Sequence, residues 1–277
     1  MKIRYTTCPA CSATAKVEDD HSGKFTCPQC GYIGHDKQKV DLTLSTYEAE
    51  KGLMQGLRYT VDIVMVIDAT ASMRHIIDEV KSNALRFYDD LRRIMEVKSK
   101  MIDNLRVKVI AFRDYYADGK DSMVLSPFYN LPEDREKFNR FVSDLRATGG
   151  GNLPENGLEA IDYALRSDWT TLGDKKRHVI VLWTDASSHP LEMDANAKPR
   201  GYPATMSKNL NELTDMWESH KILSPSSKRL ILYAPEKYAW NEISANWSNT
   251  IQYPSIAGAG LTELDYQTIL DAIANSV

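Results

Sequence analysis

The segment VDIVMVIDATASM, residues 61–73, contains an apolar run rich in Val and Ile that ends abruptly at Asp68. Such a short apolar run is typical of a buried strand, because β-branched side chains suit the pleated surface of a sheet. After Asp68 the chain continues with small residues, in which Thr70 and Ser72 alternate with alanines. The segment therefore predicts a buried strand followed by a loop that carries one carboxylate and two hydroxyl groups.

Apolar runs of this kind recur along the chain and alternate with amphipathic segments. Strands are expected over residues 59–68, 105–115, 177–185 and 228–235, and helices over 73–97, 132–147, 154–169, 205–220 and 262–275. The alternation indicates crossover connections and a mainly parallel sheet covered on both faces. We therefore expect an α/β fold of the doubly wound, Rossmann-like type over residues 59–277, after a linker at 36–58.

Composition and charge narrow the class of protein. The 277 residues carry 34 Lys and Arg against 38 Asp and Glu, a net charge of −4, so no general attraction to nucleic acid or anionic lipid is expected. No apolar stretch approaches the roughly 20 residues of a membrane helix, and the N-terminus lacks the apolar centre of a signal peptide. These features predict a cytoplasmic protein without a membrane partner.

All four cysteines lie within the first 30 residues, as the pairs Cys8-x-x-Cys11 and Cys27-x-x-Cys30 separated by 15 residues. This spacing brings four thiolates around a tetrahedral zinc ion, and a segment this short needs the metal to fold. Short strands are expected over 13–20 and 23–27, joined by a turn at 21–23. Residues 6–35 resemble the zinc ribbons of many cytosolic proteins, so we predict a zinc module over 1–35.

Several alternatives remain for this module. Disulfide formation is the alternative to metal binding for the four cysteines, although a reducing cytosol favours metal. His21 and His35 lie nearby, and we interpret both as surface residues rather than ligands. With few basic and aromatic residues in 1–35, a structural role or a protein contact is preferred over nucleic-acid binding.

The carboxyl ends of parallel strands meet at one edge of a sheet, and ligands bind there. Asp68 is expected at that edge, together with two further loops, residues 147–157 (ATGGGNLPENG) and 182–190 (LWTDASSHP), the second of which contains Asp185. Carboxylate and hydroxyl oxygens are the ligands that Mg²⁺ or Mn²⁺ prefers. The sequence therefore predicts a divalent cation site at this edge.

Residues 59–235 resemble the von Willebrand factor A family, whose metal-ion-dependent adhesion site has an Asp-x-Ser/Thr-x-Ser motif, then a Thr or Asp, then a distal Asp. The resemblance implies that Asp68, Thr70, Ser72 and Asp185 hold the metal. FRDYY at 112–116 and GGGNLPENGLEAI at 149–161 also resemble a subgroup associated with atypical kinases and bacterial stress operons. That subgroup usually has Asp in the fourth place, where this chain has Asn152, and Thr148 is the alternative ligand.

Other interpretations apply to single residues. Asp68, Thr70 and Ser72 could instead cap the following helix. For Asp114, a turn cap or an ion pair with Arg113 is favoured over auxiliary contact with the metal. His189 is interpreted as a loop residue bonded to backbone groups, or else as a gate to the site. Finally, His75 is assigned to helix surface or core, and Trp169 and Trp183 to packing against the sheet.

The sequence offers little machinery for catalysis. The glycines at 149–151 lack the Lys of a phosphate-binding loop, the cysteines are assigned to zinc, and no Ser-His-Asp arrangement is visible beside Ser72. A haloacid-dehalogenase-like phosphatase would have a second Asp where Thr70 stands. We therefore predict a non-enzymatic module that holds a partner protein's Asp or Glu through Mg²⁺ or Mn²⁺.

The resemblance makes an ATPase or kinase component of a bacterial stress or defence system a plausible partner. Two alternatives stay open, a metal-dependent phosphoester hydrolase and a nucleic-acid adaptor guided by the zinc ribbon.

Overall fold

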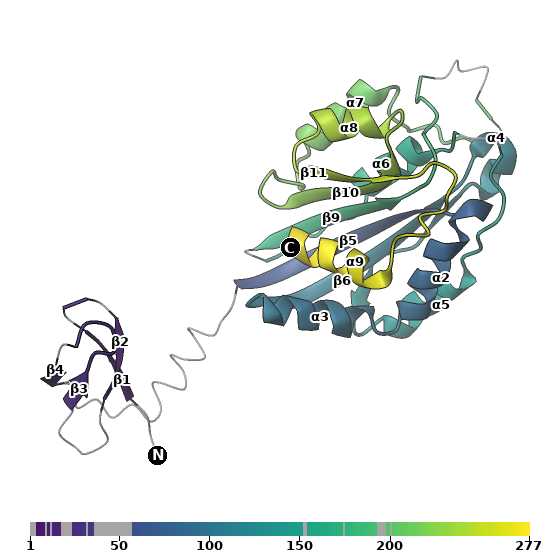
Figure 1. Cartoon of the computed structure of the whole chain (residues 1–277). Helices are drawn as coiled ribbons and strands as arrows, with labels where there is room; N and C mark the ends of the chain where they lie inside the picture. Colours follow the sequence, from purple (N-terminus) through teal and green to yellow (C-terminus); the bar gives the residue numbers. More distant parts are fainter. Residues whose placement is uncertain are drawn as a thin grey trace. The chain divides into compact units, whose positions relative to one another are not determined.

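The computed structural model describes residues 4–8, 10–11, 13–17, 24–31, 33–35, 57–151, 154–173, 175–192, 198–199 and 201–277. The chain divides into two compact units, Met1–Met54 and Gln55–Val277 (Figure 1). The predicted linker at 36–58 lies outside the described residues except for Leu57 and Arg58. These two residues open the first strand of the larger unit.

The smaller unit contains a four-stranded antiparallel sheet in the order β1-β2-β3-β4. Its strands are β1 (Arg4–Thr7), β2 (Thr14–Val17), β3 (Lys24–Thr26) and β4 (Ile33–His35). The predicted strands at 13–20 and 23–27 are found as β2 and β3, whereas β1 and β4 were not predicted. Among the described residues of this unit, the buried apolar cluster consists of Cys8, Ala15, Phe25 and Cys27. Two of the four cysteines thus belong to the buried part of the unit.

The larger unit contains a seven-stranded, mainly parallel sheet. In sheet order its strands are β11 (Thr250–Ser255), β10 (Lys228–Pro235), β9 (Lys176–Trp183), β5 (Leu57–Asp68), β6 (Lys100–Phe112) and β7 (Met123–Leu125), and β8 (Tyr129–Leu131) also pairs with β6. The strands from β11 to β6 run parallel, and β7 and β8 run antiparallel to β6. β5 therefore lies inside the sheet, with the carboxyl ends of its parallel neighbours beside its own.

Helices cover both faces of this sheet. On one face lie α2 (Arg74–Asn83), α3 (Phe87–Val97), α5 (Arg135–Asp144) and α9 (Tyr266–Ser276), and on the other lie α6 (Gly157–Leu165), α7 (Leu210–Glu218) and α8 (Trp240–Asn246) (Figure 1). Ile63, Met65 and Ile67 of β5 belong to the first core, and Val64 and Val66 belong to the second. Successive residues of a strand point to opposite faces, which explains the continuous apolar run in the sequence.

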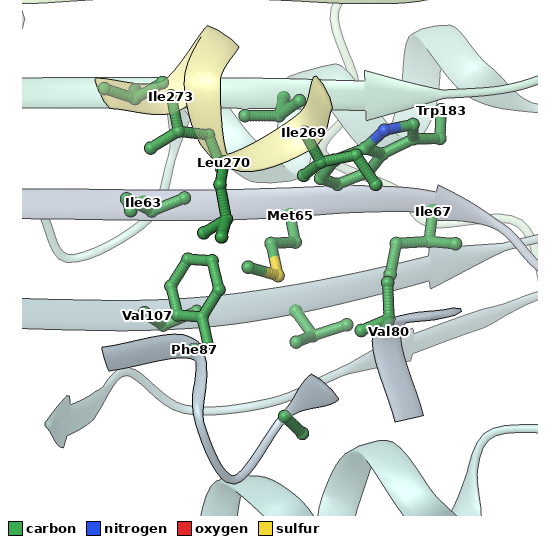
Figure 2. Packing of buried hydrophobic residues seen from close by; sticks show 14 of the residues in the cluster. Ile63, Met65, Ile67, Val80, Phe87, Val107, Trp183, Ile269, Leu270 and Ile273 are labelled. Atoms are coloured by element: carbon green, nitrogen blue, oxygen red, sulfur yellow. The ribbon is translucent and has the colours of Figure 1, made fainter. Parts of the chain in front are cut away.

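Figure 2 shows the first core, where Ile269, Leu270 and Ile273 of α9 pack over β5. Val80 of α2 and Phe87 of α3 approach the same strands. The predicted packing of the two tryptophans is confirmed. Trp183 is buried in this first core, and Trp169 is buried in the second.

The prediction of one helix over 73–97 is wrong. A short 3₁₀ turn, η1 (Ala71–Met73), leads into α2, which ends at Asn83, and α3 begins at Phe87. The Asn83 side-chain Nδ2 donates to the carbonyl oxygen of Glu79 at 2.7 Å. Such a side-chain bond competes with the backbone ladder, so Asn83 marks the point at which the helix ends.

Other boundaries differ by a few residues. Arg113 and Asp114 lie beyond β6, and the helix expected over 205–220 spans 210–218 because Asn209 caps it, its side chain accepting from the Glu212 N–H. The strands β7, β8 and β11 and the helix α8 were not predicted. None of the described helices combines the length and the apolar character needed to cross a bilayer.

Candidate functional site

The four cysteines of the smaller unit form one cluster. Their Sγ atoms all lie within 4.8 Å of one another, with 3.7 Å between Cys8 and Cys30 and 3.5 Å between Cys11 and Cys27. Sulfurs at the corners of a tetrahedral zinc site lie about 3.8 Å apart, since Zn–S bonds are about 2.3 Å long. None of the four cysteines forms a disulfide bond. The geometry therefore suits a metal ion such as zinc.

The thiol of Cys27 is already prepared for ligation. Burial raises its pKa, but the backbone N–H groups of Cys30 and Gln29 donate to its sulfur and lower the pKa to about 7. A thiolate, rather than a thiol, is the metal ligand. Of the nearby histidines, His21 lies outside the described residues, and only the backbone of His35 is described, in β4.

A second polar cluster lies at the carboxyl edge of the large sheet, centred on Asp68. Its fully buried carboxylate accepts from the Thr70 N–H at 2.9 Å and the Thr70 hydroxyl at 2.6 Å through Oδ1, and from the Thr184 hydroxyl at 2.7 Å through Oδ2. Burial raises the pKa of Asp68 to about 6, because these hydrogen bonds only partly offset desolvation and Asp185 adds its repulsion.

Asp185 completes this cluster from the loop after β9. The Ser72 hydroxyl donates to Asp185 Oδ1 at 3.1 Å, and the two hydroxyl oxygens of Thr70 and Ser72 lie 3.4 Å apart. Neither Thr70 nor Met73, at the starts of η1 and α2, makes a side-chain capping bond. The capping interpretation is therefore wrong for Thr70 and Ser72, because their side chains bond to each other and to carboxylates. The Asp68 carboxylate does accept a backbone N–H, that of Thr70, ahead of η1.

The segment after β11 reaches this edge as well. The Gly260 N–H donates to Asp185 Oδ2 at 2.8 Å, and the Gly258 N–H donates to the Asp185 backbone oxygen at 2.9 Å. Gly260 has a φ of +68°, and a Cβ atom there would lie 2.2 Å from the carbonyl oxygen of Ser72. Only glycine permits this approach, which holds both Asp185 and Ser72 in place.

Arg113 ties the glycine-rich loop to the same edge. Its Nε donates to the carbonyl oxygens of Ala69 at 3.1 Å and Thr148 at 2.7 Å, and the Thr148 N–H donates to the Ala69 oxygen at 3.0 Å. The other guanidinium nitrogens donate to backbone carbonyls of Asp121 and Arg146. The predicted ion pair between Arg113 and Asp114 is therefore wrong, because backbone carbonyls take the guanidinium donors. Asn152 lies outside the described residues.

Glu155 is a residue that the sequence prediction missed. It is only 3% exposed, and its Oε2 has no hydrogen-bond partner within the described structure. Burial, together with the charges of Asp68, Asp114, Asp118 and Asp185, raises the pKa of Glu155 to about 9. A Cβ atom built on Gly150 would meet both Thr70 and Glu155 Oε1 within 3.0 Å, so this carboxyl group lies close to the Asp68 loop.

Asp114 and His189 lie beside each other at the rim of the cluster. Asp114 Oδ1 accepts from the Tyr116 N–H at 2.9 Å and caps the short helix α4 (Tyr115–Asp118), which confirms the predicted turn cap. His189 Nε2 lies 3.4 Å from Asp114 Oδ1, its backbone N–H donates to the Glu155 oxygen, and burial lowers its pKa. His75 lies apart, partly buried, and donates through Nε2 to the Leu264 oxygen.

The polar edge offers oxygen atoms without an obvious nucleophile and base. The Ser72 hydroxyl donates to a carboxylate rather than to a histidine. Among the described residues, three or more ligand atoms of Cys, His or carboxylates lie within 4.8 Å of one another at the four thiols. At the sheet edge, hydroxyl groups instead connect Asp68 to Asp185, in the order Asp68, Thr70, Ser72, Asp185.

One curated protein is similar to about half of this chain. No model of a known protein family matches the chain. Over 146 residues the chain is 26% identical to the "Alpha-protein kinase vwkA" of Dictyostelium discoideum, a match that covers 52% of this chain and 21% of that protein. The chain thus spans about a fifth of the length of this curated relative.

Among solved structures, the chain is similar to the pilus adhesin SpaC from Lactobacillus rhamnosus GG in two crystal forms. The TM-scores are 0.49 and 0.48 with 14% identity, over 99% of this chain and 34% and 35% of the adhesin.

Proposed function

We propose that the larger unit is a von Willebrand factor A-type domain, of the doubly wound, Rossmann-like class, that binds a partner protein through Mg²⁺ or Mn²⁺. The observation that carries this proposal is the direction of two hydroxyl groups. Thr70 and Ser72 lie in one loop, and they turn toward carboxylates from two different strand ends instead of capping the next helix. This arrangement fits the adhesion-site motif that the sequence resembles.

The donor set suits a hard divalent cation. Asp68, Asp185 and Glu155 are buried carboxyl groups, and none of them forms an ion pair with a Lys or Arg of the described residues. Buried carboxylates without a counter-charge are costly, and a divalent ion beside them would remove much of that cost. The partnerless Oε2 of Glu155 offers one further oxygen.

In this proposal Thr70, Ser72, Asp68 and Asp185 would hold the ion, with Glu155 as an additional carboxylate. The bound ion would supply a positive, open coordination position that accepts an Asp or Glu carboxylate from the partner. The protein's part is to keep the hydroxyl and carboxylate oxygens in place, which Gly260 and Arg113 do through the contacts described above. We propose binding rather than catalysis, because Ser72 is bonded to a carboxylate and not to a base.

For the smaller unit we propose a zinc ribbon that has a structural or protein-contacting role. The spacing and the close approach of the four thiols support zinc. The resemblance of residues 112–116 and 149–161 leads us to propose a partner of the kinase or ATPase class in a stress or defence system. The similarity to a protein named as a kinase agrees with the kinase part of this proposal. Because the match covers a fifth of that protein, kinase activity is not proposed for this chain.

The test is Asp68→Ala in the full chain, with Mn²⁺ and Mg²⁺ binding measured by calorimetry. Metal affinity is expected to fall about tenfold or more, because the substitution removes a carboxylate that holds the Thr70 hydroxyl. Asp103→Asn is the matched control, since Asp103 is an exposed acid bonded to Arg58 and its loss should leave metal affinity unchanged.

Partner capture from a native lysate, with and without chelator, is the second measurement. Unchanged metal affinity in Asp68→Ala with a normal melting curve would refute the proposed site. Turnover of a generic phosphate ester by the Mn²⁺-loaded protein would favour a hydrolase instead.

A further inference from the structure

A recess of about 550 Å³ lies next to the polar edge of the sheet. Residues that line it include Arg113, Lys120, Val124, Leu125, Arg146 and Thr148. Thr148 also belongs to the polar edge, because its N–H donates to the oxygen of Ala69, the residue after Asp68. The recess therefore shares Thr148 and Arg113 with the polar edge.

One wall of the recess is an edge strand. β7 is the last strand at its end of the sheet within the described structure, where it pairs with β6. Two of its side chains are apolar and exposed, Val124 at 37% and Leu125 at 39%. Exposed apolar side chains at such an edge are a surface that an extended segment of another chain can contact.

The recess also carries positive charge. Arg113, Lys120 and Arg146 form no ion pair with any carboxylate of the described residues, since Arg113 and Arg146 donate to backbone carbonyls. Of the two acids in the lining, the Asp118 carboxylate already accepts from the Gly150 N–H at 2.9 Å, and Asp121 is exposed. Three cations against two acids favour an occupant that is itself acidic.

The register of the sheet gives the separation between the recess and the polar edge that carries Asp68. Asp68 pairs with Phe112 across β5 and β6, and Phe112 pairs with Met123 across β6 and β7. Two strand spacings of about 4.8 Å place Met123 about 10 Å from Asp68, a distance that an extended chain crosses in about three residues.

We propose that this recess binds an extended segment of the partner in which an acidic residue is followed or preceded, about three to four positions away, by an apolar residue. The acid reaches the polar edge at Asp68, and the apolar side chain contacts Leu125. Further acids in the segment meet Lys120 and Arg146. This inference rests on the proposed adhesion site, whose own failure shows separately in the metal titration.

The test uses the full chain as bait for a displayed library of random peptides about twelve residues long, which extend to about 40 Å. Selection is carried out in Mg²⁺ and repeated in chelator. Peptides enriched in Mg²⁺ are expected to share an acid and an apolar residue at the stated separation. Leu125→Lys should weaken their binding about tenfold or more while leaving Mn²⁺ affinity unchanged, because the exposed edge tolerates Lys without a loss of core packing.

Leu172→Lys is the matched control, because Leu172 is 76% exposed and lies far from the recess. It precedes the amino end of β9, whereas Asp185 follows the carboxyl end. This variant should bind the selected peptides as well as wild type does. The inference is overturned if the peptides bind Leu125→Lys as tightly as wild type, or if their acid and apolar positions show no fixed separation. It is also overturned if Mg²⁺ makes the chain dimerise through β7. If no Mn²⁺ binds, the adhesion site itself fails.

Discussion

Replacing Glu155 with Gln is expected to stabilise the metal-free larger unit at alkaline pH. Burial, and after it the negative charges of the neighbouring carboxylates, raise the pKa of Glu155 from 4.5 to about 9. Between these two values the folded state holds a proton that the unfolded state has released. Stability must therefore fall as pH rises through this window, and the loss is complete above about pH 9. Gln has no proton to lose, so the variant lacks this contribution.

The size of this loss of stability follows from the pH interval between the two pKa values. Each pH unit within it costs at most about 1.4 kcal/mol, so the step from about pH 5 to about pH 8 has an upper limit of about 4 kcal/mol. Relaxation and water penetration around a buried carboxylate reduce the expected difference to about 2 kcal/mol. For a unit of this size, that difference corresponds to a melting point about 6 °C higher in the variant at about pH 8.

The assay is thermal unfolding in chelator, followed by tryptophan fluorescence over the pH range. All five tryptophans lie in the larger unit, so the signal reports that unit alone. Asp68 and Glu159, whose pKa values are raised to about 6 and about 7, are present in both proteins, so the difference between the two curves isolates Glu155. Glu263→Gln, which removes an exposed carboxylate, should give the wild-type pH dependence.

If the proposed site is correct, Mg²⁺ should raise the melting point of wild type more than that of Glu155→Gln, because the variant lacks one carboxylate proposed to hold the ion. Parallel stability curves for Glu155→Gln and wild type between about pH 6 and about pH 9 would refute the reasoning. Such a result would mean that the Glu155 carboxyl group is solvated or has a cationic partner.

Two further predictions concern the zinc cluster and the glycines near Asp185. The purified protein should contain one zinc ion per chain by elemental analysis, and Cys27→Ser should lose it because three thiolates hold zinc less tightly than four; zinc retained at full occupancy would contradict this. Gly260→Ala should destabilise the larger unit by about 2 kcal/mol more than Gly258→Ala in urea unfolding. Both glycines have a positive φ, but only at Gly260 would the new Cβ meet the Ser72 oxygen, whereas nothing lies within 4 Å at Gly258. Equal losses in the two variants would show that Gly260 does not support Ser72.

Local pattern was enough to predict several parts of this protein. The spacing of Cys8, Cys11, Cys27 and Cys30 indicated one metal cluster, because turn geometry brings each pair together. The run that ends at Asp68 indicated a buried strand, and the alternation of such runs with amphipathic helices indicated a mainly parallel sheet. The first inference depends on a continuous run of apolar and β-branched residues, and the second on the 3.6-residue period of the segments between such runs.

Other features depend on contacts between distant segments. Nothing local distinguishes Glu155 from an exposed loop acid, and its burial arises because its backbone pairs with the loop after β9, where the Glu155 N–H donates to the Ser187 oxygen. Thr184 and Gly260 became part of the site in the same way, through contacts 116 and 75 residues apart in sequence.

The short edge strands β7 and β11 escaped prediction because β7 has only three residues and the apolar residues of β11, Ile251 and Tyr253, are exposed. Their pairing comes from the neighbouring strand rather than from their own side chains. The sequence thus determined which elements carry the oxygen and sulfur side chains of the two candidate sites, because those signals are local. The tertiary structure decided which side chains are buried together without a counter-charge, since burial depends on the packing of the whole sheet edge.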